Sequence, residues 1–374
     1  MKVFILTTIT APYRINLFNE LGKKCNLRVC FEQKRDLVER NNKWYDSEHN
    51  NFDYIALKNW DKSLKRIKWD AFKYLTEFNP DFVIAYEYST PTALMLMSFC
   101  RLKRIPYFIN CDGAIPSNNY LRTLIKKHYI KNAVGYFGNG ISARKYFLKY
   151  NGKEEKIIPY KFSNYYKKDI LEKPLSKIEK EQKKEDLGIK YKKVFLSIGR
   201  FEFLKGFDLL IDLAQKYKEN EEIGFVFIGG GPLEEQYKKE IEEKNLKNIT
   251  ILPYMDKEQL MNYYDISDCF IFPTRRDIWG LVVVEAMSRG LPVITSDDSM
   301  AGIELVEDSK NGYIFKSGDT EKLKEAIDKL ISMDNQMLFD LGEESINRIK
   351  DYYIEKMAED HYNALEKTYK GKEK

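Results

Sequence analysis

The chain has 374 residues, of which 43% are hydrophobic and 32% charged. A chain of this length can bury two hydrophobic cores, so two domains are the first expectation. Five cysteines without a Cys-x-x-Cys pair argue against structural disulfides and favour a reducing compartment. Because the apolar run at residues 3–9 is too short for a signal peptide, and none reaches the roughly 18 residues of a membrane span, we expect a cytoplasmic protein, soluble or peripheral on the inner face of the cell membrane.

The charge is distributed unevenly. Residues 1–165 contain 28 Lys and Arg against 15 Asp and Glu, a net charge of +13; the total of +5 leaves −8 for the remainder. A basic half predicts an anionic partner. No nucleic-acid-binding motif accompanies the charge, so the favoured partners are an anionic membrane surface or a lipid-linked phosphate. Residues 120–132 mix cations with apolar side chains, as interfacial helices do, although a core helix with one solvated face would show the same composition.

The first half of the chain alternates between apolar strands and helical stretches, which predicts a parallel α/β domain. The expected strands are residues 3–9, 27–31, 81–86, 106–111 and 134–137. The polar residues 39–53 predict a flexible or irregular loop. Residues 163–193 are rich in Lys and Glu and predict a linker followed by an exposed helix.

The second half repeats this pattern, with strands expected near residues 194, 225, 249, 269 and 291, each followed by a helix or turn. Two Rossmann-like, doubly wound domains are therefore predicted. In open α/β sheets, ligands bind beyond the carboxyl ends of the strands. Two such domains that face each other would enclose a cleft.

Two carboxylates, Asp277 and Glu285, are separated by seven residues across a loop that runs into a helix. Gly280 opens that helix, so the amides near Gly280 and Leu281 lack intrahelical partners and lie at the positive end of the helix dipole. Such amides suit a phosphate. The neighbouring carboxylates can accept hydrogen bonds from sugar or ribose hydroxyls.

Two cations, Arg200 and Lys205, flank another strand-to-helix junction. A single cation on a loop is ordinarily a solvated charge, but two beside such a turn favour a clamp on a diphosphate. Gly230 and Gly231 belong to a Gly-Gly-Gly-Pro turn in which the backbone could approach a ligand, although glycines after a strand are often only turn residues.

These segments together resemble the retaining glycosyltransferases of family 4, which have the GT-B fold. The resemblance covers about residues 190–345 and rests on Gly199-Arg200 with Lys205-Gly206, on Gly229-Gly-Gly-Pro232, on Tyr264, Asp268 and Pro273-Thr274, on the paired carboxylates, and on Gly290-Leu-Pro-Val-Ile. It implies that Glu285 holds the nucleotide ribose, that Arg200 and Lys205 bind the diphosphate, and that Asp277, where glutamate is usual, contacts the donor sugar. The segment around Asp277 looks like the corresponding segment in the branch of the family that builds bacterial surface polysaccharides.

The resemblance implies an acceptor-binding domain at residues 1–165, against which the C-terminal helix 352–374 packs, and a donor domain at residues 166–351. On the acceptor side we single out Tyr13 and Arg14, after the first strand, and Asp112, at the end of another. Arg14 could equally form a salt bridge with Glu20 or another acid on the helix side. Asp112 could simply be a turn or cap aspartate.

No metal or cofactor is expected, because Asp-x-Asp near a strand end is lacking and Arg200, Lys205 and the helix dipole can balance the leaving diphosphate. His49, His128 and His361 do not form a site by spacing and are interpreted as surface or half-buried side chains. Tyr264, Asp268 and Trp279 are attributed to aromatic packing and helix capping.

The expected activity is that of a glycosyltransferase of the hexosyltransferase type. It moves a sugar, with retention, from a nucleotide-diphosphate sugar to a hydroxyl of a lipid-linked glycan. Uridine is favoured as the nucleotide on family frequency alone. A GT-B nucleotide-sugar epimerase and a non-catalytic nucleotide-sugar-binding subunit are the alternatives.

Overall fold

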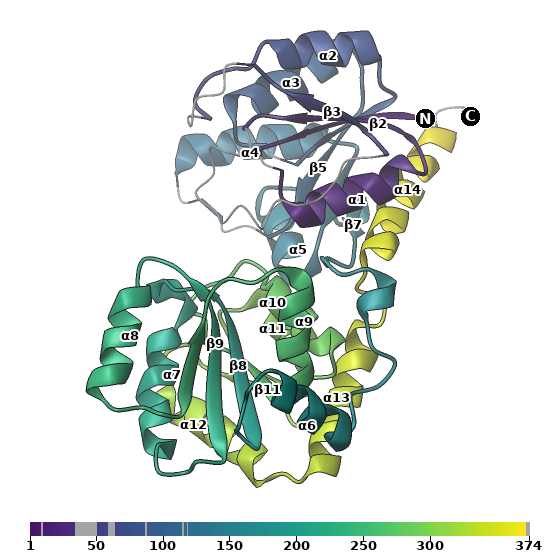
Figure 1. The fold of residues 1–374 in the computed structure, drawn as a ribbon. Helices are drawn as coiled ribbons and strands as arrows, with labels where there is room; N and C mark the ends of the chain where they lie inside the picture. The colour runs from purple at the N-terminus through teal and green to yellow at the C-terminus, as the bar shows by residue number, and fades with distance from the viewer. Residues whose placement is uncertain are drawn as a thin grey trace. The chain divides into compact units, whose positions relative to one another are not determined.

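The computed structural model describes residues 1–8, 10–33, 51–58, 64–86, 88–113, 116–117 and 119–371. The chain forms two compact units: unit 1 is Met1–Lys167 with Tyr352–Lys374, and unit 2 is Lys168–Asp351. Each unit contains one sheet with helices on both faces (Figure 1), which confirms the predicted α/β class with two Rossmann-like halves. His49 and all but the last residues of the loop expected at 39–53 lie outside the described residues.

The sheet of unit 1 has seven strands in the order β3-β2-β1-β4-β5-β6-β7, all paired in parallel. They are β1 (Lys2–Thr7), β2 (Asn26–Phe31), β3 (Asp53–Ala56), β4 (Phe82–Ala85), β5 (Tyr107–Cys111), β6 (Gly135–Gly138) and β7 (Ile157–Pro159). The central strands are apolar runs buried on both faces, as in parallel sheets generally. The two edge strands, β3 and β7, were not expected from the sequence because they are only four and three residues long.

Helices cover both faces of this sheet. They are α1 (Pro12–Gly22), α2 (Asp70–Phe78), α3 (Pro91–Leu102), α4 (Tyr120–Asn132), α5 (Gly140–Lys149) and α14 (Ile354–Lys370). Figure 1 shows α14, in yellow, beside α1, in purple. The buried residues of α14 recur at helical spacing, from Ile354 through Met357, Ala358 and His361 to Leu365. This apolar stripe explains why the last helix packs on unit 1.

The sheet of unit 2 has six parallel strands in the order β10-β9-β8-β11-β12-β13. They are β8 (Lys193–Arg200), β9 (Ile223–Gly230), β10 (Ile249–Leu252), β11 (Cys269–Phe272), β12 (Val293–Ser296) and β13 (Gly312–Phe315). The edge strand β13 is an addition to the predicted set, since four residues after a polar loop give little periodic signal. In both sheets the strand order reverses once, between β1 and β4 and between β8 and β11.

The helices of unit 2 lie on both faces of its sheet, with α7, α8 and α12 on one side and α6, α9, α10 and α13 on the other (Figure 1). They are α6 (Lys177–Asp186), α7 (Phe207–Ala214), α8 (Glu234–Glu243), α9 (Lys257–Ile266), α10 (Leu281–Ser288), α11 (Met300–Leu305), α12 (Thr320–Ser332) and α13 (Asn335–Ile349). The core between the sheet and α7 and α12 is built from aromatic and branched aliphatic side chains.

The helix expected before β8 is α6, and it is exposed along most of its length, except at Lys184. The side chain of Lys184 is buried, and its ammonium donates to the carbonyl of Lys192 at 2.7 Å and lies 3.4 Å from Asp268 Oδ2. Lys180 donates to the carbonyl of Ser267 at 2.7 Å. Long lysine stems can pack against apolar surface while their ammonium groups find polar partners, so composition alone does not predict the burial of Lys184.

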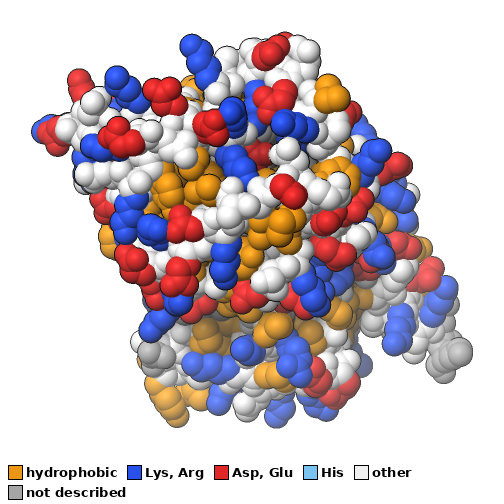
Figure 2. Space-filling model, turned by 90° about the horizontal axis from the view of Figure 1, so that it is seen from below, with side chains coloured by type: hydrophobic (Ala, Val, Ile, Leu, Met, Phe, Trp, Pro, Cys, Tyr) orange, Lys and Arg blue, Asp and Glu red, His pale blue; other side chains and the backbone are white. Residues whose placement is uncertain are grey.

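Charged side chains of both signs are interspersed on the surface, as the face in Figure 2 shows. Many form pairs within one helix, such as Lys238 with Glu234 in α8 and Lys324 with Asp328 in α12. Such pairs are screened by solvent and contribute little. These charges therefore add little to the stability of either unit.

Candidate active site

Two loops leave the carboxyl edge of the unit 2 sheet at the point where its strand order reverses. The first follows β8 from Arg200 to Gly206 and includes a short 3-10 turn, η5 (Phe203–Lys205); the second follows β11 from Pro273 to Gly280. This reversal point is where open α/β sheets bind ligands. Half of the predicted donor-binding residues lie on these two loops: Arg200, Lys205, Asp277 and Gly280.

Two hydrogen bonds to one backbone carbonyl hold the two loops together. The hydroxyl of Thr274 donates to the carbonyl of Leu204 at 2.8 Å, and the amide of Arg275 donates to the same carbonyl at 2.7 Å. Gly206 has φ +75°, and a Cβ there would lie 2.1 Å from the carbonyl oxygen of Pro273. Only glycine fits both the left-handed conformation and this close approach.

Lys205 and Asp277 meet across the joined loops. The Lys205 ammonium lies 2.6 Å from Asp277 Oδ2, and the two side chains are 20% and 16% exposed. The amide of Trp279 donates to Asp277 Oδ1 at 3.0 Å. Both oxygens of the predicted sugar-binding carboxylate therefore accept a hydrogen bond in this structure.

The start of α10 lies directly after this loop. Gly280 has φ +99°, and a Cβ there would lie 2.9 Å from the ring of Phe272, so the entry to the helix requires glycine. The first-turn amides, beginning with Leu281, have no acceptor four residues earlier within the helix. The amide of Val283 donates to the carbonyl of Gly280 at 3.0 Å, and the amides before it stay the predicted anion site.

Glu285 lies one turn further along α10 and is almost fully buried. The hydroxyl of Tyr264, a buried residue of α9, donates to Glu285 Oε2 at 2.9 Å. The sequence attributed Tyr264 to packing alone, and no local pattern around it predicts this hydrogen bond. Asp268 is structural, as expected, but it accepts the amide of Val194 at 2.8 Å rather than capping a helix.

The remaining donor candidates lie on the same edge of the sheet. Arg200 ends β8 with its side chain 54% exposed, and its Nε lies 3.8 Å from Glu202. Gly230 ends β9, and its carbonyl accepts the amide of Phe201 at 3.0 Å; Gly231 follows it. The turn after β9 is thus tied to the loop after β8.

Unit 1 contains a second polar cluster, centred on Asp112 at the end of β5. Asp112 accepts from Arg14 Nη2 at 3.1 Å, from Asn110 Nδ2 at 2.6 Å and from the hydroxyl of Tyr160 at 2.5 Å. Burial raises the pKa of Tyr160 well above its ordinary range, so this hydroxyl stays protonated and donates. Tyr13 packs its ring edge to face against Phe162, with centroids 5.3 Å apart.

Two alternatives for this cluster are corrected by these contacts. Arg14 pairs with Asp112, whereas Glu20 pairs with Lys23 at 2.6 Å. Asp112 is held by three side-chain donors and is more than a turn aspartate.

The interpretation of His361 as a surface or half-buried side chain is wrong, because His361 is fully buried. Its Nδ1 lies 2.8 Å from the carbonyl of Met357 and its Nε2 lies 3.2 Å from the hydroxyl of Tyr86. Its ring stacks on Phe137 at a centroid distance of 4.3 Å. Burial lowers the pKa of His361 to about 4, so the imidazole is neutral at pH 7. His128 is exposed, as expected, 2.5 Å from Arg101 Nη1.

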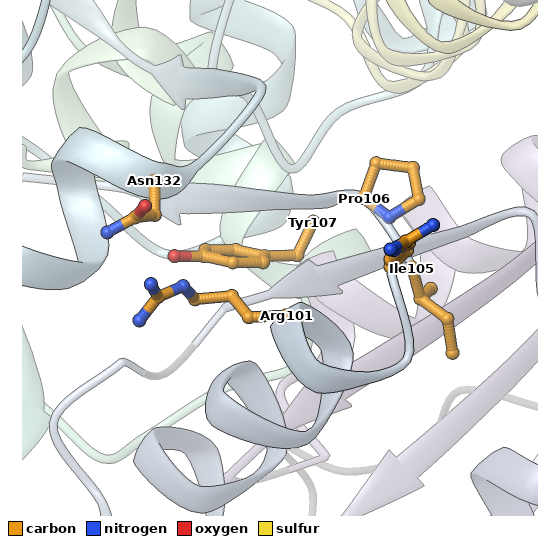
Figure 3. A pocket seen from close by; sticks show the side chains of 6 residues that line it. Arg101, Ile105, Pro106, Tyr107 and Asn132 are labelled. Carbon is orange, nitrogen blue, oxygen red and sulfur yellow. The ribbon is translucent and has the colours of Figure 1, made fainter.

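A cavity of about 380 Å³ lies at the opposite edge of the unit 1 sheet. Its lining residues are Arg101, Arg104, Ile105, Pro106, Tyr107 and Asn132. Figure 3 shows the side chains of Arg101, Tyr107 and Asn132 directed toward one another. These residues lie at the amino end of β5, away from Asp112 at its carboxyl end, so the cavity is separate from the polar cluster.

Helix α4 leaves large apolar side chains in solvent. Tyr120 is 73% exposed and Leu121 69%, Leu124 and Ile125 are also exposed, and of the whole helix only Ile130 is buried. Lys126 differs from its neighbours, because its ammonium lies 5.1–5.9 Å from the ring centroids of Tyr88, Tyr146 and Tyr150. Within the described residues, no helix is both long enough and apolar enough to cross a membrane.

Comparison with known proteins identifies the domain in which the first cluster lies. Residues 179–348 match the family described as glycosyl transferases group 1. The matched stretch lies within unit 2. An uncharacterized glycosyltransferase of Haemophilus influenzae is 30% identical over 182 residues, which are 45% of this chain and 47% of that protein. An O-antigen chain mannosyltransferase of Escherichia coli is 25% identical over 138 residues, 36% of each chain. The match spans less than half the length of either relative.

Solved structures of this family's fold extend the likeness to both units. An Anabaena protein in complex with UDP has a TM-score of 0.77 and 16% identity, covering 98% of this chain and 100% of that one. At this level of identity the likeness concerns the fold alone. It confirms the expected GT-B fold class for a chain with a group 1 domain.

Proposed function

We propose that this protein transfers a sugar from a nucleoside diphosphate sugar to a hydroxyl of a lipid-linked glycan. The observation that carries the proposal is the meeting of Lys205 and Asp277 at the strand reversal of a group 1 domain, beside the helix that holds Glu285. The UDP bound to the Anabaena structure supports a uridine nucleotide. The O-antigen role of the Escherichia coli relative supports a surface polysaccharide as the product.

In this proposal the donor is held by unit 2. Arg200 and Lys205 bind the diphosphate with charge-assisted hydrogen bonds, together with the first-turn amides of α10. Glu285 binds the ribose hydroxyls, and Asp277 binds hydroxyls of the donor sugar. The charge that develops on the leaving diphosphate is balanced by these two cations and the helix dipole, so no metal ion is assigned to the reaction.

The proposed chemistry retains the configuration of the anomeric carbon. The acceptor hydroxyl attacks on the face from which the diphosphate leaves; the bond from the anomeric carbon to the phosphate oxygen breaks as the new glycosidic bond forms. The acceptor proton passes to the leaving phosphate, and no protein nucleophile is assigned. Tyr13, Arg14 and Asp112 of unit 1 are proposed to bind the acceptor. The three donors to Asp112 fix the orientation of its carboxylate.

We further propose that unit 1 binds the anionic inner surface of the cell membrane through α4, where a lipid-linked acceptor would be found. Exposed apolar side chains at Tyr120, Leu121, Leu124 and Ile125 suit the headgroup boundary. Residues 101–150 contain ten Lys and Arg against a single acid, Asp112, which suits anionic lipid. The core-helix alternative is not favoured, because α4 buries only Ile130.

Binding measurements on two clamp variants test the donor site. Arg200→Ala and Lys205→Ala should each weaken binding of UDP far more than that of uridine, since each removes a charge-assisted contact of roughly 1.5–3 kcal/mol. Lys239→Ala, which removes an exposed lysine of α8, is the matched control and should change neither affinity. Equal losses for UDP and uridine would mean that the two cations only support the loop.

Three further measurements test the reaction itself. Thermal-shift screening against UDP, GDP and dTDP sugars identifies the donor, because a ligand at about 100 times its Kd stabilises by roughly 2.7 kcal/mol. NMR of the product reports whether the anomeric configuration is retained. Turnover that is lost on adding EDTA and restored by Mg²⁺ would overturn the metal-free assignment.

A further inference from the structure

The ion pair between Lys205 and Asp277 raises a question about the order of events in the donor site. The same two residues are assigned to different parts of the donor, yet here they are paired with each other at 2.6 Å. While the lysine ammonium lies on Oδ2, one acceptor position of that oxygen is taken and part of its charge is offset, so it binds a sugar hydroxyl less strongly. While the Lys205 ammonium lies beside the carboxylate, part of its charge is offset, so its attraction for a phosphate is weaker.

The surroundings of the ion pair hold Asp277 in place and leave Lys205 able to move. Asp277 is fixed by the amide of Trp279 on Oδ1, and its own amide donates to the carbonyl of Asp298 at 2.9 Å, so the carboxylate cannot easily move away. Lys205 is the mobile partner, because its long side chain extends from the end of the η5 turn and four rotatable bonds separate its ammonium from the backbone. Any change in the pairing is therefore made by the lysine.

We propose that the Lys205–Asp277 ion pair is exchanged when the donor binds: the diphosphate takes the Lys205 ammonium, and Asp277 Oδ2 becomes available to a sugar hydroxyl. This inference rests on the proposed donor site. A diphosphate carries more negative charge than one carboxylate and offers several oxygens, so it competes well for a single ammonium. Sugar recognition then follows diphosphate recognition, and a sugar without its diphosphate meets a carboxylate that is already occupied.

The exchange predicts that removing the Asp277 carboxylate raises the affinity for UDP, whereas a simple loss of function predicts a lower affinity. Asp277→Asn should tighten the binding of UDP by about three- to tenfold, because Lys205 no longer has to leave an ion pair. The same variant should lose the preference for the UDP-sugar over UDP. Uridine, which has no phosphate, should bind Asp277→Asn and the unmodified protein alike.

A double-mutant cycle separates this exchange from general repulsion between Asp277 and the phosphates. In a Lys205→Met background, Asp277→Asn should no longer tighten UDP binding, since the residue that was released is absent. In an Arg200→Ala background the gain should persist. Asp212→Asn is the matched control, because it removes another lysine–aspartate pair of 2.6 Å, with Lys244, at the exposed surface and outside the two loops; it should leave UDP affinity unchanged.

The titrations use the full chain with UDP, and with GDP and dTDP in parallel, after the melting temperature of each variant has shown that it is folded. Asp277→Ser replaces Asp277→Asn if the latter does not fold. A gain that survives in the Lys205→Met background, or an Asp277→Asn protein that binds UDP no more tightly, would overturn the exchange while leaving the donor site in place. If none of the three nucleotides binds the unmodified protein, or if Lys205→Met and Arg200→Ala both bind UDP normally, the donor site itself is wrong and the inference falls with it.

Discussion

The carboxylate of Glu285 is oriented by a buried tyrosine on the neighbouring helix. Tyr264 lies on α9 and Glu285 on α10, 21 residues apart, and a tyrosine in an apolar helix face is ordinarily a packing residue. By contrast, the proximity of Lys205 and Asp277 follows from simple topology. Both residues follow strands of one parallel sheet, so they emerge at the same edge.

Tyr264→Phe tests whether this orientation matters for the donor. The variant removes one hydrogen bond to a charged group, worth about 1.5–3 kcal/mol, while keeping the ring in the core. We expect the KM for the nucleotide sugar to rise by about tenfold or more, with a smaller change in kcat, because Glu285 is proposed to bind ribose rather than the reacting carbon.

Tyr263→Phe is the control, since it removes a neighbouring hydroxyl from the half-buried face of the same helix. Isothermal titration with UDP and steady-state kinetics measure both variants. Equal KM values for Tyr264→Phe and Tyr263→Phe would show that the hydrogen bond to Glu285 has no part in donor binding.

Helix α14 packs on unit 1 through a neutral histidine, so the stability of the folded protein depends on pH. His361 has its pKa lowered from an ordinary 6.5 to about 4, chiefly by burial, with Asp112 and Asp360 opposing the shift. The unfolded chain therefore binds a proton between these two values that the folded chain does not. Stability is fully present above pH 6.5 and is lost as the pH falls toward 4.

The expected loss is roughly 2 kcal/mol in the free energy of unfolding between pH 7 and pH 5, out of about 3 kcal/mol over the whole window. Urea unfolding followed by fluorescence measures it. His361→Gln should be less stable than the unmodified protein at pH 7 but should lose much less between pH 7 and pH 5. Parallel slopes for the two proteins would assign the pH dependence to other groups.

Helix α4 is the element on which membrane binding is proposed to depend. Neutralising Arg122, Lys127 and Lys131 to Gln should weaken binding to anionic vesicles by about 1 kcal/mol per cation, and the effect should shrink as salt shortens the Debye length from about 10 Å at 0.1 M to about 3 Å at 1 M. Lys126 is left unchanged, since its ammonium lies over three tyrosine rings. Leu121→Ser with Leu124→Ser should also reduce binding by removing apolar contact.

Vesicle sedimentation measures these variants against neutral vesicles. The control replaces Lys216, Lys218 and Lys239 of unit 2 with Gln, which changes the net charge by the same amount. Should both triple variants lose binding equally, net charge rather than α4 would explain the interaction.

The elements show what periodicity can and cannot predict. Long buried strands such as β1 and β8 are continuous apolar runs and were recognised from the sequence. The edge strands β3, β7 and β13 were not, because three or four residues do not establish a period and their pairing depends on distant neighbours. The buried face of α6 was not predicted, because each lysine was treated as an exposed charge and its apolar stem was left out of account.

At the scale of the whole molecule, unit 1 is assembled from two separate stretches of chain, whereas unit 2 is one continuous stretch. Ending the chain after Asp351 would remove α14 and uncover the face of α1 against which it packs. We expect the melting transition of unit 1 to be lost or strongly lowered, because five buried side chains of α14 would be missing. UDP binding, which is assigned to unit 2, should survive.

Differential scanning calorimetry with and without UDP measures both parts of this prediction. Ending the chain after Tyr369, which keeps all five buried residues of α14, is the control and should behave as the full chain does. A protein ended after Asp351 with an unchanged calorimetric profile would contradict the structural role of α14.

The split of unit 1 also sets the order in which the chain can complete its cores during synthesis. Domains generally fold as they emerge from the ribosome, with the N-terminal one first. Here α14 follows all of unit 2 in the sequence, so unit 2 can close its core while α1 still exposes the surface that α14 will cover. Unit 1 is begun first and completed last, so its α1 face stays uncovered through the whole translation of unit 2.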